Sequence, residues 1–320
     1  MINLLKDKKK FILILSISFL FFFLKWALSF YFFYSNDLTI KIIDESSSSF
    51  ASGDSYTYFH YIKSLSTFNF KALYSPELST DYFLLIPYGS IIFHSIFYKL
   101  IGDLSFILLE FIAINIFILV FYSIFRLINF PKNSAILLSV LLYILPETLA
   151  FFNNFGIIEL NTFARNFYVL RFPRPFISNL LFFIFIYTLV KSHLSNSIFL
   201  SKNLFVLALI FGLSLSSFFF VFLTQAITFI LYLIISYKKK VFKFININIK
   251  KILYSLVIFL LITLPFFFLV LNTNPDYSER MGIINISFSD KVFLLKHYLY
   301  KLFRIKLIII YIFLFLSYFF

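Results

Sequence analysis

Long apolar runs separated by short polar segments recur along the whole chain. Runs of about 15 to 25 apolar residues have the length of an α-helix that crosses a bilayer. The alternating apolar and polar segments of a membrane β-barrel are absent, and lipid permits no other spanning structure. The pattern therefore predicts an all-α, polytopic transmembrane helix bundle. Nine runs are candidates for spans: residues 11–34, 82–101, 104–128, 134–151, 176–190, 203–220, 222–237, 252–271 and 305–320.

The run 82–101 differs from the others because it contains Pro87, Gly89, His94 and Lys99. On a helical wheel its polar and apolar residues separate into two halves. The polar half holds Ser90, His94, Ser95, Tyr98 and Lys99, and the apolar half holds Leu85, Ile92, Phe93, Ile96, Phe97 and Leu100. This separation is typical of an amphipathic helix that lies at the membrane interface. We therefore expect about eight spans and one interfacial helix.

The basic residues predict the orientation of these spans. Nine spans would place the basic stretch YKKKVFKF outside, against the positive-inside rule. With eight spans, Lys and Arg are roughly three times as dense inside as outside. The start MINLLKDKKK, followed by a long apolar run, predicts an uncleaved first helix with a cytoplasmic N-terminus. We expect a single multi-pass domain over residues 1–320 in the plasma (inner) membrane of the cell envelope. Its external loops would be 35–103, 152–175 and 272–304.

The composition excludes several classes of protein. A chain that is 61% hydrophobic and 13% charged is not a soluble domain. The net charge of +14 follows from basic ends at the cytoplasmic face, so no nucleic acid partner is expected. No cysteine is present, and the four histidines lack paired spacing, so neither a metal nor a cofactor is expected. Lys25 stands within the first run, where we expect it to snorkel or to pair with Glu110.

The first external loop offers a candidate base. In SGDSYTYFHYIKSL, Asp54 precedes the helical spacing of Tyr58, Tyr61, Ile62 and Leu65. An aspartate at this position caps a helix. A carboxylate held above the membrane also suits general-base chemistry, and the two roles are compatible.

The second external loop contains the stretch RNFYVLRFPRP, with Arg165, Arg171 and Arg174 on the side where basic residues are disfavoured. Guanidinium groups bind phosphate oxygens through paired hydrogen bonds, so these arginines are candidates for a phosphate site. Alternatively, they contact lipid headgroups or pair with Glu147 and Glu159.

The order of these features resembles the membrane glycosyltransferases of the GT-C class, over roughly the first three-fifths of the chain. A first helix is followed by a loop with Asp54, Tyr56 and Tyr58, then by the amphipathic segment IPYGSIIFHSIFYKLIG and a span. The class includes protein O-mannosyltransferase-like and aminoarabinose-transferase-like enzymes. The resemblance implies transfer of a sugar from a polyprenyl-phosphate donor to a lipid, glycan or protein acceptor at the external face. It implies Asp54 as the catalytic base, with Asp44 and Glu45 as competing positions.

On this interpretation Arg165, Arg171 and Arg174 hold the donor phosphate, and Tyr58, His94 and Glu159 are supporting residues. The chain departs from the class at two places. Only Pro87 stands where two prolines are common, and only Glu159 stands where some members carry an Asp-x-Asp metal motif.

Two other functions stay open. A transporter or flippase of lipid-linked saccharides would also bind a polar headgroup, but it is expected to show inverted repeats, and none is found. An O-antigen-polymerase-like membrane protein is the other alternative.

Overall fold

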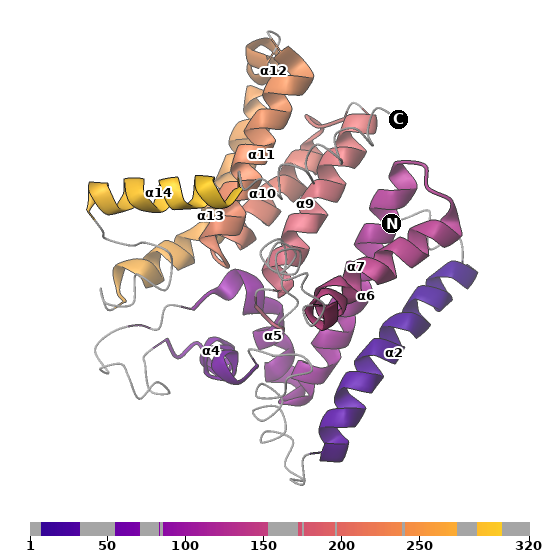
Figure 1. Cartoon of the computed structure of the whole chain (residues 1–320). Helices are drawn as coiled ribbons and strands as arrows, with labels where there is room; N and C mark the ends of the chain where they lie inside the picture. The colour runs from indigo at the N-terminus through magenta and orange to yellow at the C-terminus, as the bar shows by residue number, and fades with distance from the viewer. Residues whose placement is uncertain are drawn as a thin grey trace. The chain divides into compact units, whose positions relative to one another are not determined.

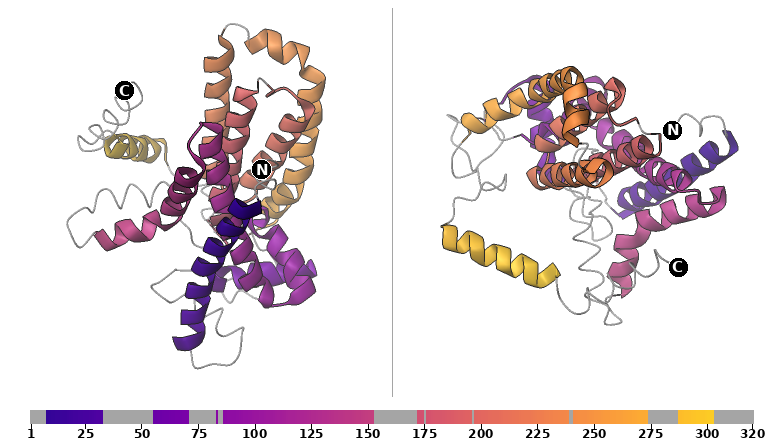
Figure 2. Two further views of the ribbon diagram at one scale, coloured as in Figure 1. Left: turned by 90° about the vertical axis from the view of Figure 1, so that its right-hand side faces the viewer. Right: turned by 90° about the horizontal axis from the view of Figure 1, so that it is seen from above.

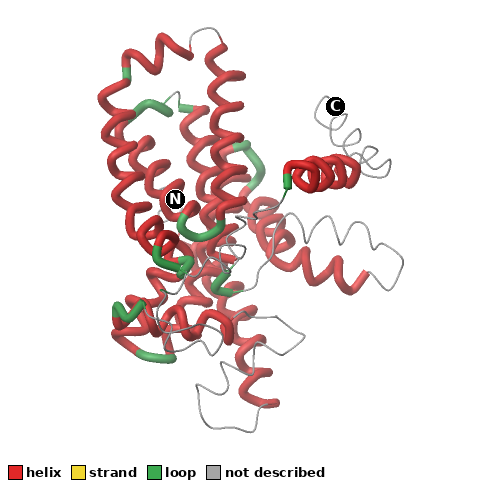
Figure 3. The backbone as a smooth tube through the Cα atoms, turned by 90° about the vertical axis from the view of Figure 1, so that its left-hand side faces the viewer, coloured by secondary structure: helices red, strands yellow, loops and turns green. Residues whose placement is uncertain are grey.

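The computed structural model describes residues 8–32, 55–70, 83, 86–152, 172–174, 176–195, 197–238, 241–273 and 287–302. These residues form helices joined by turns, with no strand among them (Figure 3). The chain divides into two compact units, Met1–Pro275 and Asp276–Phe320. The second unit contributes one described helix, α14 (Phe288–Leu302).

The first unit contains the remaining described helices. They are α2 (Lys8–Phe32), α4 (Ser55–Thr67), α5 (Tyr88–Ile101), α6 (Leu104–Leu127), α7 (Lys132–Phe152), α9 (Phe176–Leu194), α10 (Ser201–Leu215), α11 (Phe219–Tyr237), α12 (Val241–Ile247) and α13 (Ile249–Leu271). Five helices are long and apolar enough to cross a bilayer: α2 over Lys8–Ala27, and α6, α9, α11 and α13 over their full lengths. They coincide with five of the predicted spans. The chain is therefore a multi-pass helical membrane protein at this level of description.

Three further predicted spans are not among these five helices. The run 134–151 lies in α7, a helix of 21 residues whose side chains are described only up to Leu145, and 203–220 corresponds to the short helix α10 of 15 residues. The run 305–320 lies outside the described residues. The total of eight spans stays a prediction.

The turn between α10 and α11 falls earlier than the apolar pattern indicates. The chain leaves α10 after Leu215 and enters α11 at Phe219, whereas the runs predicted a break at position 221. The Ser216 hydroxyl donates back to the Gly212 carbonyl, and the Ser216 carbonyl accepts from the Gly89 backbone N–H at 3.3 Å. A contact with α5, distant in sequence, thus accompanies the early end of α10.

The described spans form two neighbouring groups (Figures 1 and 2). In one, α2 and α7 pack on α6; in the other, α10 packs on α9, α11 and α13, and contacts between α6 and α9 join the groups. Aromatic packing fills the junction, where the Phe117 ring lies edge-on to Phe183 at 5.7 Å between centroids. Many large apolar side chains of α11 and α13 point outward, as expected for helices that face lipid.

Segments predicted to share a side of the membrane contact one another. The backbone N–H of Phe83, in the first external loop, donates to the carbonyl of Asn272 at 3.0 Å, and the Thr273 hydroxyl donates to the Phe83 carbonyl at 2.9 Å. At the other end Lys10 Nζ donates to Asn133 Oδ1 at 2.7 Å, joining two segments predicted to be inside. These contacts agree with the predicted grouping of the loops, and the alternation of the chain between the two sides of the membrane stays a prediction. The assignment of one end to the cytoplasm stays a prediction from charge.

Helix α5 covers the second part of the predicted interfacial segment 82–101: it starts six residues later, at Tyr88, and ends where predicted, at Ile101. It begins after Pro87 and has 14 residues, too few for a span. It stops at Gly102, whose φ of +58° is the left-handed conformation that favours glycine, and the Gly102 N–H donates to the Tyr98 carbonyl at 2.8 Å. The next helix, α6, starts two residues later.

Three residues of the polar half of α5 face the protein, whereas Lys99 of the same half is exposed and much of the apolar half faces outward. Ser90, His94 and Ser95 are buried, whereas Phe93 is 60% exposed and Leu100 is 73% exposed. The helix packs against α4, α6, α9 and α10. An apolar surface that faces outward suits contact with lipid, where it costs nothing to expose apolar side chains.

Candidate functional site

Arg174 and Tyr58 bring together the two segments predicted to be the first and second external loops. The Nη1 group of Arg174 donates a hydrogen bond to the Tyr58 hydroxyl at 3.2 Å. Tyr58 is buried in the first turns of α4, and Arg174 is partly buried just before α9. The two residues are far apart in the sequence, so only the folded chain makes them neighbours.

The Arg174 guanidinium also lies over an aromatic ring. Its central carbon is 4.6 Å from the centroid of Phe218, in the turn between α10 and α11. Beside this turn the buried hydroxyls of Ser178 and Ser217 share a hydrogen bond between α9 and the same turn. A cation over a ring is attracted to its face, so Arg174 is held from two sides by Tyr58 and Phe218. The side chain still carries hydrogen-bond donors that could bind phosphate oxygens.

His94 lies beside this contact, on the polar half of α5. Its ring centroid is 4.1 Å from that of Phe106 and 5.5 Å from that of Phe172. The imidazole is 2% exposed. Burial lowers the pKa of His94 from 6.5 to about 3, because an apolar environment disfavours the charged ring. His94 is therefore neutral at physiological pH.

Tight packing fixes α5 against α10. A Cβ atom at Gly89 would lie 1.9 Å from the Leu213 carbonyl oxygen, so no other residue fits here without a shift of the backbone. One residue earlier, the Tyr88 hydroxyl donates to the Ile262 carbonyl of α13. These contacts anchor the start of the helix that carries His94.

The predicted site residues fall into two groups. Arg174, Tyr58 and His94 are described: Arg174 contacts Tyr58 directly, and His94 contacts Phe172, two residues before Arg174. The remaining ones lie outside the described residues: Asp54, Asp44, Glu45, Arg165, Arg171 and Glu159. Helix α4 starts at Ser55, directly after Asp54, in agreement with the predicted helix start.

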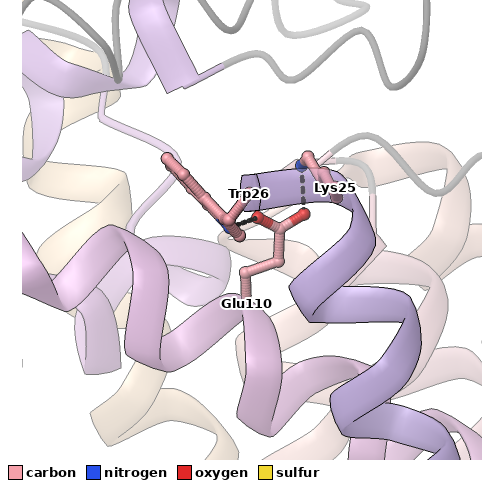
Figure 4. Close-up of polar contacts among 3 residues, drawn as sticks. All are labelled: Lys25, Trp26 and Glu110. Atoms are coloured by element: carbon pink, nitrogen blue, oxygen red, sulfur yellow. Dashed lines mark hydrogen bonds and ion pairs between the residues drawn. The ribbon is translucent and has the colours of Figure 1, made fainter. Parts of the chain in front are cut away.

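A second polar cluster lies between α2 and α6 (Figure 4). Lys25 Nζ and Trp26 Nε1 both donate to the carboxylate of Glu110, the latter to Oε2 at 3.0 Å. The Lys25 side chain is 13% exposed and that of Glu110 is 6% exposed. Of the two alternatives for Lys25, pairing with Glu110 is confirmed. Because both carboxylate oxygens have donors, the cluster joins two helices rather than presenting a free acid or base.

Several of these partners were missed by the sequence analysis. Phe218 and Phe172 are two among 52 phenylalanines, and no local pattern distinguishes them. Trp26 is the single tryptophan and adjoins Lys25, which is a signal that could have pointed to the cluster at Glu110. Among the residues that the structure describes, no three His, Asp or Glu side chains are grouped as a metal site requires.

No protein-family model, no curated protein and no solved structure matches this chain.

Proposed function

We propose that this chain is a GT-C-like glycosyltransferase that moves a sugar from a polyprenyl-phosphate donor to an acceptor hydroxyl at the external membrane face. The observation that supports it best is the hydrogen bond from Arg174 to Tyr58. It joins the loop that carries the arginines to the helix that begins directly after Asp54. A base and a phosphate-binding cation must approach one another for a direct displacement, and this contact favours such an arrangement.

The proposed reaction is a single displacement at the anomeric carbon. The carboxylate of Asp54 takes the proton of the acceptor hydroxyl while that oxygen forms a bond to the anomeric carbon. The bond between the anomeric carbon and the phosphate oxygen breaks, and its electron pair stays on the phosphate. Arg174, with Arg171 and Arg165, stabilises the negative charge that grows there. Because that charge is larger in the transition state than in the bound donor, this contact accelerates the reaction.

The position of Arg174 fits this role. Tyr58 and Phe218 hold the guanidinium without neutralising it, since neither side chain is a carboxylate. A cation that is already oriented loses little entropy when it binds the phosphate.

The base is tested by sugar transfer in proteoliposomes that contain the purified chain and labelled polyprenyl-phosphate sugars. Asp54→Asn should reduce turnover roughly 10²- to 10⁴-fold, the range for loss of a general base. Asp290→Asn makes the same chemical change at an exposed site in α14 and should leave turnover unchanged. Near-normal turnover of Asp54→Asn would move the role to Asp44 or Glu45. Passage of the donor across the bilayer without transfer would instead support the transporter.

The phosphate contact is tested by an arginine series. Activity should fall in the order Arg174, Arg174→Lys, Arg174→Ala, because lysine keeps the charge but loses the planar fork. Arg126→Lys, at the opposite end of the bundle, is the matched control. Equal activity of wild type and Arg174→Lys would favour a contact with mobile lipid headgroups. Full activity of Arg174→Ala would remove this arginine from the mechanism.

A further inference from the structure

His94 is the titratable side chain of the site that has no hydrogen-bonding partner among the described residues. Neither Nδ1 nor Nε2 has a partner, although both atoms are buried. The other polar residues on its helix face behave differently. Ser90 donates to the Pro87 carbonyl and Ser95 donates to the Ile91 carbonyl, each at 3.0 Å. Buried polar groups in folded proteins are nearly always hydrogen-bonded, so the two free nitrogens require an explanation.

Two short chains of contacts connect the imidazole to the Arg174–Tyr58 pair. Phe172, which contacts His94, stands two residues before Arg174. Phe59, which follows Tyr58 on α4, stacks on Phe106 at 5.6 Å, and Phe106 contacts His94. The imidazole is thus connected to α4 through Phe106 and to the segment that carries Arg174 through Phe172.

We propose that His94 binds the hydroxyl groups of a hexosyl group on the donor, an assignment that rests on the proposed function. A neutral imidazole donates a hydrogen bond from one nitrogen and accepts one at the other. Sugar hydroxyls do both, and they would satisfy the two free nitrogens together. The surrounding Phe59, Phe106 and Phe172 rings offer the apolar surface on which the C–H groups of a sugar pack.

Two other roles for His94 fit less well. A general base must accept a proton near neutral pH, whereas burial holds the pKa of this ring at about 3. A phosphate ligand would be repelled by the lone pair of the nitrogen that carries no proton, and Arg174 already supplies a cation for it. A neutral, hydroxylated ligand matches both nitrogens.

The sugar would reach His94 by displacing the ring of Phe172. In the structure this ring packs against the imidazole. A phosphate bound by Arg174, two residues further on, would pull on the same short segment. The order of binding would then be phosphate first and sugar second.

The test compares the binding of two kinds of probe to the detergent-solubilised chain. One is a short-chain polyprenyl phosphate without sugar. The others carry glucose, mannose, galactose or N-acetylglucosamine. Wild type should bind one glycosylated probe about tenfold more tightly than the sugar-free probe, the gain expected for two added hydrogen bonds.

His94→Phe keeps a ring of similar shape and removes both nitrogens, so it should lose this gain and keep its affinity for the sugar-free probe. His94→Gln keeps a donor and an acceptor and should retain part of the gain. His193→Phe, at the opposite end of α9, is the matched control. If His94→Phe does not fold, His94→Leu removes the same nitrogens and serves for the same comparison.

Each outcome decides one claim. The role of His94 is overturned if wild type and His94→Phe gain the same affinity from the sugar. It is also overturned if none of the four sugars increases the affinity of wild type. Both results leave phosphate binding in place. If wild type does not bind the sugar-free probe, or binds it no better than Arg174→Ala does, the proposed function fails and His94 loses its assignment with it.

Discussion

At the scale of single residues, the hydroxyl of Tyr58 is the feature that orients Arg174. Tyr58→Phe removes the acceptor of the hydrogen bond and keeps the ring, which packs at 5.9 Å from Tyr61. A hydrogen bond to a charged group contributes about 1.5–3 kcal/mol, so we expect turnover to fall about tenfold or more. Sugar transfer in proteoliposomes measures this loss. Tyr61→Phe makes the same change three residues later and should have little effect. Equal activity of the two variants would show that the contact does not orient Arg174 during turnover.

The buried ring of His94 predicts a pH dependence of stability. The pKa of His94 is lowered from 6.5 to about 3 in the folded chain. Between these two pH values His94 is therefore protonated in the unfolded chain and neutral in the folded chain. The free energy of unfolding should therefore decrease as the pH falls from 6.5 towards 3, by up to about 1.4 kcal/mol per pH unit, and this residue should contribute no slope above that range. Thermal denaturation in detergent between pH 7.5 and 4.5 measures the slope. His94→Phe should flatten it; an unchanged slope in His94→Phe would assign the effect to other groups.

At the scale of secondary-structure elements, the Lys25–Glu110 pair connects α2 to α6. Removing one partner leaves a buried charge without compensation, so Lys25→Met and Glu110→Leu should each destabilise the chain by about 3–5 kcal/mol. The double variant leaves no buried charge, so its free energy of unfolding should be closer to that of wild type than the value for either single variant. A double-mutant cycle of denaturation in detergent measures the coupling. Losses that simply add up would mean that the pair does not hold the two helices together.

Helix α5 shows how far a local pattern predicts an element. Its two halves and its end at Gly102 follow from the order of residues. The side that packs on the protein does not, because the usual preference for buried apolar side chains fails where lipid replaces water. His94 and Ser95 are inside and Phe93 is outside, the reverse of a soluble helix.

At the scale of the whole molecule, the contacts between loops support two groups of loops, one at each end of the helix bundle. The distribution of charge predicts which group is external. The absence of cysteine permits a direct test with single cysteines and an impermeant thiol reagent. Thr67 is exposed at the end of α4, and Ser201 is exposed at the start of α10. In intact cells Thr67→Cys should react, and Ser201→Cys should react only after permeabilisation. The opposite result would invert the orientation and place the proposed site in the cytoplasm.

The sequence by itself determined the elements and their environment. Five apolar runs became helices long enough to span, the segment after Pro87 became a short amphipathic helix, and α4 began directly after Asp54. Lys25 was predicted to snorkel or to pair with Glu110, and the structure selects the pair. These features depend on residues a few positions apart, whose spacing sets hydrophobic length and helix faces. The excess of Lys and Arg in some loops is also read from short stretches of sequence. It predicts which loops are inside and which are outside.

Only the tertiary structure decided which residues meet. Arg174 lies against Tyr58 and Phe218, and His94 lies between Phe106 and Phe172, because α4, α5, α6, α9 and α10 converge at one end of the bundle. The early turn after Leu215 has the same origin, since Gly89 of α5 supplies a donor to Ser216. No local spacing encodes contacts between segments that are far apart in the chain. In lipid the apolar pattern does not encode these contacts either, because an apolar side chain has a similar free energy against a neighbouring helix and against the lipid chains.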